Sequence, residues 1–349
     1  MVLSYYIYKY PYVIAWYLAK IFGKQKDIVF YCADPLDCEM FAPIQKHLPP
    51  IKIVAKNKKT RDYLESKGVS YFRMPVFPKA VIMARHAAYK FPVDEIVKIG
   101  FDHGLYQFKR WTAAQNYNRF DVYFVSSPEQ VRTAKTLGIT TTSAIGYPKL
   151  DPAFDGTYDE KYLEKIKKEL KIAPDKKTII FTSTWNVDGL SALDKWIDRV
   201  GELTEEYNIL ITVHTWTEKS KIEKLKKIER AFFLDKFDVT PYLMISDVFV
   251  GDYNSLIGEA CALDKPIITF RVPQSPRAIA TVRKMIEDIS LQINSFEEIR
   301  EAIKRCLKNP TEKSEERKKA NKIMFLALDG KAGKRAAEEI LKRVDFSSK

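Results

Sequence analysis

Three apolar runs in the second half of the chain each end in side chains that could bind an anion. The run at residues 178–182 continues into Ser183 and Thr184, the next ends at His214, and the third leads into the turn 252–255, which reads DYNS. The carboxyl ends of parallel strands meet at one edge of a sheet, so these groups are expected to lie together. Hydroxyls, an imidazole and backbone N–H groups suit a phosphate, and the pattern predicts an anion-binding pocket.

The turn 252–255 carries the strongest local signal. Asp252, Asn254 and Ser255 are residues that favour helix N-caps, and they stand between an apolar run at 248–250 and a helical pattern at 256–263. Backbone N–H groups and the helix dipole favour a phosphate at such a junction. A capped helix without a ligand would use the same residues, so the segment alone leaves both interpretations open.

A further candidate for chemistry lies in the first half of the chain. His103, in the segment FDHG, directly follows an apolar run at 96–101 and precedes Gly104. A histidine at the end of a strand suits a general base, because the pKa of an imidazole lies near working pH. Asp102 would orient the ring or point to solvent. A structural histidine in a strand-to-helix loop is the alternative interpretation.

An α/β alternation positions these groups and runs through the chain twice. In the first half, strand-like runs lie at residues 27–31, 51–55, 96–101, 122–126 and 143–146, separated by helical or turn-rich segments at 38–47, 60–67, 81–89 and 128–137. This alternation predicts one parallel sheet with crossover helices.

The second half repeats the plan after a stretch at 151–158 that is typical of a hinge. Strands are expected at 178–182, 208–213, 248–250 and 266–270, and helices at 159–171, 190–207, 219–232, 256–263, 295–308, 315–326 and 331–344. We predict two Rossmann-like domains, at residues 1–155 and 156–349, with parallel sheets facing each other across a cleft. Neither half contains a GxGxxG fingerprint, so no dinucleotide cofactor is expected.

The composition indicates a globular protein with an affinity for anions. Of 349 residues, 46% are hydrophobic and 30% are charged, and the net charge is +13. Residues 1–90 contain 15 Lys and Arg against 6 Asp and Glu. No nucleic-acid-binding signature accompanies this surplus, so lipid headgroups or an anionic substrate are the expected partners. An ion-pair-rich surface, which is common in proteins of thermophiles, is the alternative explanation of the many lysines. The four cysteines and four histidines show no metal-binding spacing, so reduced thiols and no metal are expected.

The first 26 residues crowd eight aromatic side chains among four lysines. No run of 18 uninterrupted apolar residues occurs, so a spanning helix is not expected. Aromatic rings and lysines together suit the membrane–water interface. Packing of the same aromatics on their own domain, or on a second subunit, is the alternative.

Several segments together resemble the CDP-glycerol glycerophosphotransferases, which include the teichoic acid primases and polymerases. FDHG resembles the family's Trp-His-Gly motif, and IGYPKLD at 145–151 its Gly-Tyr-Pro-Arg-x-Asp motif. FTSTW at 181–185 resembles Pro-Thr-Trp, and VH at 213–214 resembles Arg-x-His. DYNS with Glu259 resembles Asp-Tyr-Ser-Ser followed by an acidic residue, and DGKAGKR at 329–335 a C-terminal Asp-Gly element. The resemblance covers about residues 95–340 and implies the GT-B fold.

The resemblance also implies roles for the matching positions. His103 would deprotonate the acceptor hydroxyl, and His214, the second catalytic residue, would hold the donor diphosphate. The implied donor-binding residues are Thr184, Trp185, Asp252, Tyr253, Asn254, Ser255 and Glu259. The residues implied at acceptor or interdomain positions are Gly104, Gly146, Lys149 and Asp151. The chain departs from the family pattern at Asp102, Lys149, Asn254 and Thr212. The last replaces an arginine and removes a bidentate phosphate donor.

The expected function is therefore transfer of a polyol phosphate from CDP-glycerol or another CDP-polyol to an acceptor hydroxyl, with release of CMP, in cell-envelope polymer or glycolipid synthesis. A GT-B glycosyltransferase or nucleotide-sugar epimerase using a UDP- or GDP-sugar is the first alternative, and a non-catalytic binding protein the second. The expected partners are the nucleotide donor, a lipid-linked or glycan acceptor and an anionic membrane surface, with a homo-oligomer left open. The expected location is the cytoplasm, peripheral on the inner face of the cell membrane.

Overall fold

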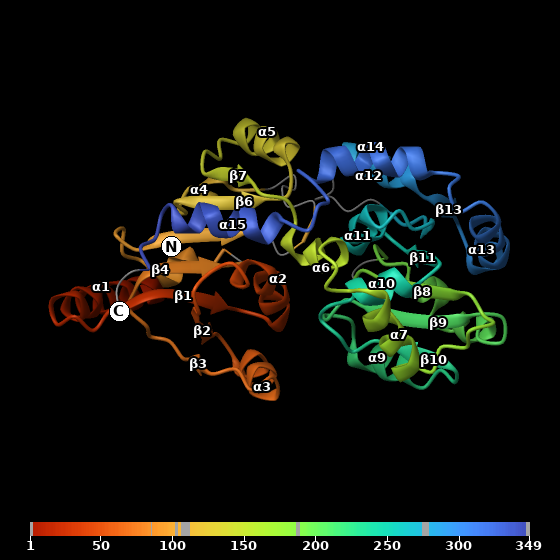
Figure 1. The fold of residues 1–349 in the computed structure, drawn as a ribbon, viewed down its shortest axis with the longest axis horizontal. Helices are drawn as coiled ribbons and strands as arrows, with labels where there is room; N and C mark the ends of the chain where they lie inside the picture. Colours follow the sequence, from red (N-terminus) through yellow and green to blue (C-terminus); the bar gives the residue numbers. More distant parts are fainter. Residues whose placement is uncertain are drawn as a thin grey trace. The chain divides into compact units, whose positions relative to one another are not determined.

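The chain forms two compact α/β units (Figure 1). The computed structural model describes residues 3–84, 86–101, 104–105, 112–185, 189–273 and 279–346. Unit 1 contains the described residues up to Asp151 together with those from Phe325 onward, and unit 2 contains Pro152–Met324. Unit 2 is thus inserted, in sequence, between two parts of unit 1.

Unit 1 is built on a seven-stranded parallel sheet in the order β3-β2-β1-β4-β5-β6-β7. The strands are β1 (Lys26–Cys32), β2 (Lys52–Ala55), β3 (Tyr71–Phe72), β4 (Pro78–Met83), β5 (Val97–Phe101), β6 (Val122–Val125) and β7 (Thr142–Ala144). The order reverses between β1 and β4, where Val29 lies opposite Val81. This is the topological switch point of a Rossmann-like sheet.

Three of the helices that pack on this sheet begin at a side-chain N-cap. The helices of unit 1 are α1 (Leu3–Ile21), α2 (Pro35–Gln45), α3 (Lys58–Ser66), α4 (Ala114–Tyr117), α5 (Pro128–Thr136) and α15 (Ala332–Leu341), with 3-10 turns η1 (Ala88–Lys90) and η2 (Pro148–Leu150). Asp34, Asn57 and Ser127 cap α2, α3 and α5 by accepting backbone N–H groups of the first turn.

Helix α1 is bound to unit 1 through one face. The Tyr12 hydroxyl donates to the Val76 carbonyl at 2.7 Å, and the Trp16 indole N–H donates to the Pro78 carbonyl at 2.8 Å. Both side chains are buried. Buried Tyr and Trp need such partners, because an unsatisfied O–H or N–H is costly away from water. The inner face of α1 is therefore part of the core of unit 1.

Unit 2 has six parallel strands in the order β10-β9-β8-β11-β12-β13, which repeats the order of the first six strands of unit 1. The strands are β8 (Thr178–Ser183), β9 (Asn208–Val213), β10 (Ala231–Phe233), β11 (Val248–Gly251), β12 (Ile267–Phe270) and β13 (Leu291–Ile293). The helices are α7 (Glu160–Glu169), α8 (Leu193–Trp196), α9 (Lys219–Lys226), α10 (Thr240–Ile245), α11 (Leu256–Ala262), α12 (Ala280–Ile289), α13 (Ile299–Lys308) and α14 (Ser314–Met324). Short helical segments η3 (Val200–Leu203), η4 (Phe296–Glu298) and α6 (Asp151–Phe154) complete the chain.

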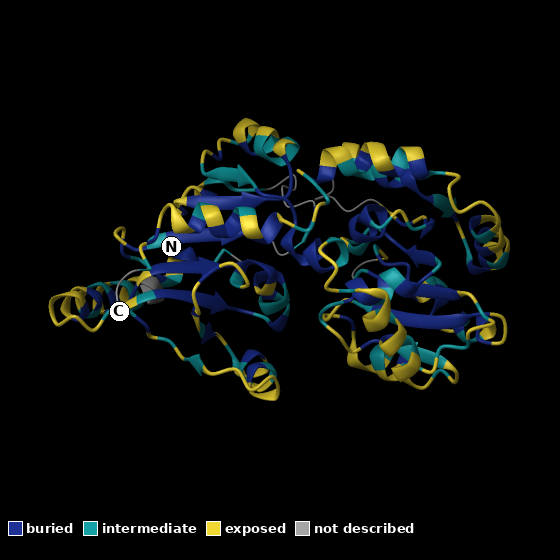
Figure 2. Cartoon of the chain, viewed as in Figure 1, coloured by how far each residue is buried: buried dark blue, intermediate teal, exposed yellow. Residues whose placement is uncertain are grey.

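The central strands of unit 2 are buried along their whole length (Figure 2). Helices cover both faces of a parallel sheet, so the middle of β8 (Ile179–Phe181) and β11 are continuous apolar runs and show no alternation. Phe181 of β8 packs against Trp196 of α8, and both are fully buried. This core fixes the positions of the strand ends that carry the candidate site.

The C-terminal helix α15 belongs to unit 1. The sequence alone predicts it in the C-terminal domain, at residues 156–349. The Asp151 carboxylate accepts the backbone N–H groups of Ala332 at 3.0 Å and Gly333 at 2.6 Å, at the start of α15. Gly333 lies so close to α2 that an added Cβ would meet the Pro43 carbonyl oxygen at 2.3 Å. Gly146 has a φ of +96° and faces Ala332 in the same contact. Two motifs 181 positions apart thus form one structural junction.

Some predicted elements differ from the structure. Residues 81–89, expected to be helical or turn-rich, include the end of strand β4. The single helix expected at 190–207 is two short segments, α8 and η3. The helix expected at 219–232 ends at Lys226 and is followed by β10. At the end of β4, burial within the sheet, which a single sequence does not show, overrides local helical periodicity.

Among the residues that the structure describes, we find no helix whose length and hydropathy would allow it to cross a membrane.

Candidate functional site

The predicted polar strand ends of unit 2 surround its topological switch point. β8 lies between β9 and β11, so the residues that follow these three strands share one edge of the sheet. In open α/β sheets ligands bind at this edge, outside the point where the strand order reverses. The polar strand ends predicted from the sequence therefore lie at the position that this fold uses for ligands.

Asp252, directly after β11, ties this edge together. Its carboxylate accepts the Ser183 hydroxyl at 2.7 Å and the Thr184 backbone N–H at 2.9 Å. It also accepts the Ala192 backbone N–H at 2.9 Å and the Asn254 side-chain amide at 3.1 Å. Four donors from two separate loops thus converge on one carboxylate.

Asp252 positions the loops and is shielded from solvent. Its side chain is 0% exposed. Burial raises the pKa of the carboxyl above its usual range, against the opposing effect of the surrounding hydrogen-bond donors. The sequence predicted Asp252 among the donor-binding residues. Its contacts support an indirect part in binding, through the shape of the 183–192 loop.

The other polar residues of the turn lie in different environments: Asn254 is hydrogen-bonded to the backbone, and Ser255 faces solvent. The Asn254 side-chain oxygen accepts the Leu256 backbone N–H at 3.0 Å, so Asn254 begins the turn into α11. Ser255 is exposed, and its side chain makes no cap hydrogen bond. Its hydroxyl is therefore presented to solvent beside the buried Asp252. Glu259, also predicted for the donor site, is a buried residue within α11.

Tyr253 connects the turn to two residues that the sequence did not single out. Its hydroxyl donates to the Glu287 carboxylate at 3.1 Å, and the Arg283 guanidinium lies 4.9 Å from the centre of its ring. Arg283 also pairs with Glu287 at 2.9 Å. Only the hydrophobic pattern of 280–289, which predicts a helix facing the sheet, could have drawn attention to Arg283.

His214 follows β9 with an exposed side chain. The Trp216 backbone N–H donates to its Nδ1 atom at 3.1 Å. Because Nδ1 accepts this bond, a neutral imidazole carries its proton on Nε2. His214 therefore offers an N–H donor, which suits a phosphate oxygen better than it suits proton abstraction.

Trp185, which follows β8, lies near His214 and Trp216. The ring centroids of Trp185 and His214 are 6.4 Å apart, and those of Trp185 and Trp216 are 5.3 Å apart. Thr184, predicted together with Trp185, is half-buried. The structure thus brings together the predicted donor residues Thr184, Trp185, His214, Asp252, Tyr253, Asn254 and Ser255 at one sheet edge.

The residues predicted in unit 1 have a different outcome. His103 and Asp102 lie outside the described residues, and their roles stay predictions. Gly104 lies in a bend after β5. Lys149 is buried in η2, next to the junction that Asp151 and Gly146 form with α15. The contacts of these last two residues account for their presence without a substrate.

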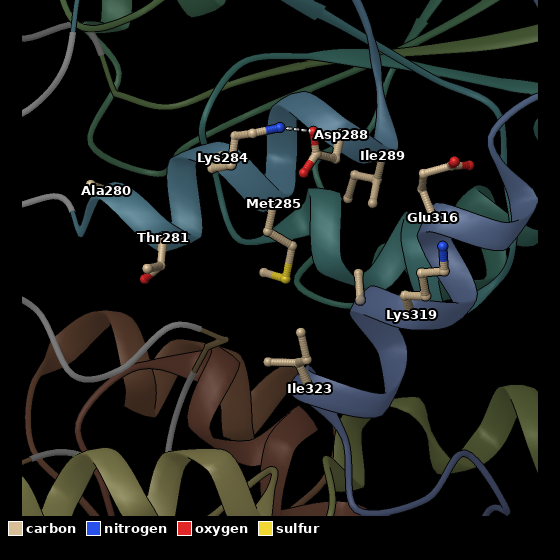
Figure 3. Close-up of a pocket in the computed structure, with 10 residues that line it drawn as sticks. Ala280, Thr281, Lys284, Met285, Asp288, Ile289, Glu316, Lys319 and Ile323 are labelled. Carbon is tan, nitrogen blue, oxygen red and sulfur yellow. Dashed lines mark hydrogen bonds and ion pairs between the residues drawn. The ribbon is translucent and has the colours of Figure 1, made fainter.

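The described residues contain no group of three or more His, Cys, Asp or Glu side chains that could hold a metal ion. They do form a hollow of about 700 Å³ between α12 and α14, where Met285 and Ile323 face each other and Lys284 pairs with Asp288 (Figure 3). None of the residues that line this hollow was predicted for the site. They belong to α12 and α14 and not to the loops that follow β8, β9 and β11.

Comparison with known families identifies the chain. Residues 86–342 match the model of the CDP-Glycerol:Poly(glycerophosphate) glycerophosphotransferase family. The chain belongs to this family. The resemblance predicted from motifs is thereby confirmed.

Curated relatives of this glycerophosphotransferase-family chain include teichoic acid polymerases. The teichoic acid ribitol-phosphate polymerase TarK of Staphylococcus aureus is 26% identical over 170 residues, which cover 44% of this chain and 32% of TarK. The teichoic acid poly(glycerol phosphate) polymerase of Bacillus spizizenii is 30% identical over 137 residues, or 37% of this chain and 34% of that polymerase. The chain thus spans about a third of the length of these relatives.

Solved structures place the glycerophosphotransferase-family chain in the GT-B fold. A structure of the wall teichoic acid polymerase TagF has a TM-score of 0.71 at 16% identity and covers 96% of this chain and 97% of that one. A UDP-GlcNAc 2-epimerase from Neisseria meningitidis has a TM-score of 0.62 at 13% identity, covering 91% of this chain and 100% of that one. The prediction of a GT-B fold with two Rossmann-like domains is confirmed.

Proposed function

We propose that this protein transfers a polyol phosphate, glycerol phosphate in the first instance, from a CDP-linked donor to an acceptor hydroxyl in cell-envelope polymer synthesis. The observation that carries the proposal is the polar edge at the switch point of unit 2, in a chain that matches the family model over residues 86–342. A diphosphate needs hydrogen-bond donors held in place, and the Asp252 network holds this edge in a fixed shape.

The reaction we propose is a displacement at the phosphorus that carries the polyol. The acceptor oxygen forms a new bond to this phosphorus, the bond from phosphorus to the CMP oxygen breaks, and CMP leaves. His103 takes the proton of the acceptor hydroxyl, as the family resemblance implies. His214 donates its Nε2 proton in a hydrogen bond to a diphosphate oxygen, and Ser255 adds a second donor. Positioning and charge neutralisation supply most of the rate in such a reaction.

A donor screen tests this proposal against its main alternative. Purified protein is incubated with CDP-glycerol, CDP-ribitol, UDP-sugars and GDP-sugars, and the released nucleotide is identified. We expect CMP from a CDP-polyol once an acceptor carrying a terminal polyol hydroxyl is present. Release of UDP or GDP, or interconversion of the nucleotide sugar, would instead establish a glycosyltransferase or epimerase.

We also propose that the outer face of α1 binds an anionic membrane surface, where a lipid-linked acceptor would be presented. Ile7, Ile14 and Ile21 recur every seven residues along this face and are 62–75% exposed. Seven residues are close to two helical turns, so these side chains form one apolar stripe. The exposed Tyr10 and Leu18 widen the stripe, and lysines near it would meet acidic headgroups.

The two faces of α1 reconcile the alternatives left open by the sequence. Tyr12 and Trp16 support packing on the protein's own domain. The isoleucine stripe supports a further apolar partner, because contiguous exposed apolar surface marks interaction sites. Deletion of the segment would damage the core of unit 1, so point variants are the informative test.

The test compares the triple variant Ile7→Ser, Ile14→Ser, Ile21→Ser with Ile323→Ser, which alters an exposed isoleucine of unit 2. We expect the triple variant to lose most co-sedimentation with phosphatidylglycerol vesicles and to keep its melting temperature. Ile323→Ser should bind as the wild type does. A triple variant that changes the oligomeric state, with no vesicle binding by the wild type, would assign the stripe to a second subunit.

A further inference from the structure

Two tryptophans and a histidine form an exposed aromatic corner at the carboxyl ends of β8 and β9. The planes of Trp185 and Trp216 are at 90° with centroids 5.3 Å apart, and His214 stands at 77° to Trp216. The ring planes of Trp185 and His214 make an angle of only 37°. The latter two therefore form one side of the corner, and Trp216 forms a wall perpendicular to both.

The exposure of this corner contrasts with the other tryptophans that the structure describes. Trp16 is 2% exposed and Trp196 is fully buried, whereas Trp185 is 39% and Trp216 is 67% exposed. Indole rings carry a large apolar area that favours burial, and paired exposed rings at a sheet edge indicate a ligand surface. Packing within unit 2 does not account for the position of Trp216.

We propose that this aromatic corner, with Trp216 as the ring that contacts the base, binds the pyrimidine ring of the donor nucleotide. The inference rests on the proposed function, and it names the part of the donor that the corner recognises. Of the parts of a CDP-polyol, only the base has a flat π face. A base gains affinity by stacking on an aromatic side chain, whereas a phosphate has no surface that could stack in this way.

The placement of the corner fits the length of a nucleotide. Neighbouring strands are about 4.8 Å apart, so the ends of β9 and β11, on either side of β8, lie about 10 Å apart. A base at the corner would leave the diphosphate near His214, Thr184 and the loop shaped by Asp252. His214 belongs to both parts of this arrangement, since its ring forms a side of the corner and its Nε2 proton would bind the diphosphate.

The test removes the ring of Trp216 and keeps its backbone. Trp216→Leu leaves the backbone N–H that bonds His214 Nδ1, so the histidine retains its tautomer. Calorimetry measures the dissociation constants of CDP and of inorganic pyrophosphate for the wild type, Trp216→Leu, Trp216→Phe and the control Tyr162→Leu. Tyr162 is an exposed aromatic residue on α7, outside the corner, and is 39% exposed, as Trp185 is.

We expect Trp216→Leu to weaken CDP about tenfold, the usual scale of one base–aromatic contact, and to leave pyrophosphate unchanged. Trp216→Phe should recover part of the loss, and the control should bind as the wild type does. Tight CDP binding by Trp216→Leu would overturn the inference while the proposed function stands. In steady-state kinetics, a Trp216→Leu variant in which only the KM of the acceptor rises would overturn the inference in the same way. A wild type that binds no CDP would overturn both.

Discussion

Each unit buries an aspartate shortly after a strand at its switch point, and the two carboxylates accept hydrogen bonds over different separations in sequence. Asp37 of unit 1, in α2 after β1, accepts the backbone N–H groups of Ala33 and Asp34, three and four residues away. Asp252 of unit 2, after β11, accepts groups 60–69 residues away in sequence. The first completes the start of one helix, whereas the second joins two loops. Similar topology therefore yields a locally capped turn in unit 1 and two loops joined through one carboxylate in unit 2.

The largest expected effect separates the chemistry of the two units. His103→Ala should lower the turnover number by about 10²–10⁴, the usual contribution of a general base, with little change in donor affinity. His214→Ala should weaken the binding of CDP-glycerol, because it removes an N–H group that donates a hydrogen bond to the diphosphate. Steady-state kinetics and CDP-glycerol calorimetry on both variants measure this difference. Equal loss of donor affinity in His103→Ala would make His103 a diphosphate ligand and remove the proposed division of labour.

The two buried aspartates provide the next test. Asp252→Ala should lower the free energy of unfolding by about 2–4 kcal/mol, because four donors lose a buried acceptor, and it should also weaken CDP-glycerol binding. Asp37→Ala should lower stability and leave donor affinity intact. Denaturant unfolding and calorimetry distinguish these effects. Unchanged donor affinity in a folded Asp252→Ala protein would show that the edge keeps its shape without this carboxylate.

A smaller effect is expected at the junction of α15 with α2. Gly333→Ala should lower the stability of unit 1 by about 1–3 kcal/mol, since its Cβ would collide with the Pro43 carbonyl. Gly201→Ala in unit 2, where the nearest atom is a side-chain methyl of Ile228 at 3.2 Å, is the matched control. Melting curves of both proteins compare the two sites. Equal melting temperatures would mean that α15 moves away from α2 without cost.

The smallest change is expected at Ser255. Ser255→Ala should weaken CDP-glycerol by about tenfold or less, the equivalent of one hydrogen bond to a charged group. The melting temperature should stay the same, because this serine makes no cap hydrogen bond. A lower melting temperature with full donor affinity would instead show that Ser255 stabilises the turn.

The sequence predicts most of the two sheets and the polar edge of unit 2, because strand ends are marked by a change from apolar to polar residues. This change predicts that His214, Thr184 and the turn 252–255 share one edge, whereas their binding of a donor stays a prediction. The burial of Asp252 could not be predicted, since it depends on a loop that approaches from 60 residues away. The junction of Asp151 with α15 was missed for the same reason. Local patterns carry no information on such distant pairings.

The insertion of unit 2 between the parts of unit 1 has a consequence for biosynthesis. Helix α15 packs on α2, and the Asp151 carboxylate gains its hydrogen bonds only when residues 332 and 333 have been synthesised. A chain emerging from the ribosome therefore completes unit 2, which is contiguous from Pro152 to Met324, before unit 1 can close. Truncation a few residues before α15 would leave the first-made half of the protein as the unfinished one, with the apolar surface of α2 open to chaperones and proteases.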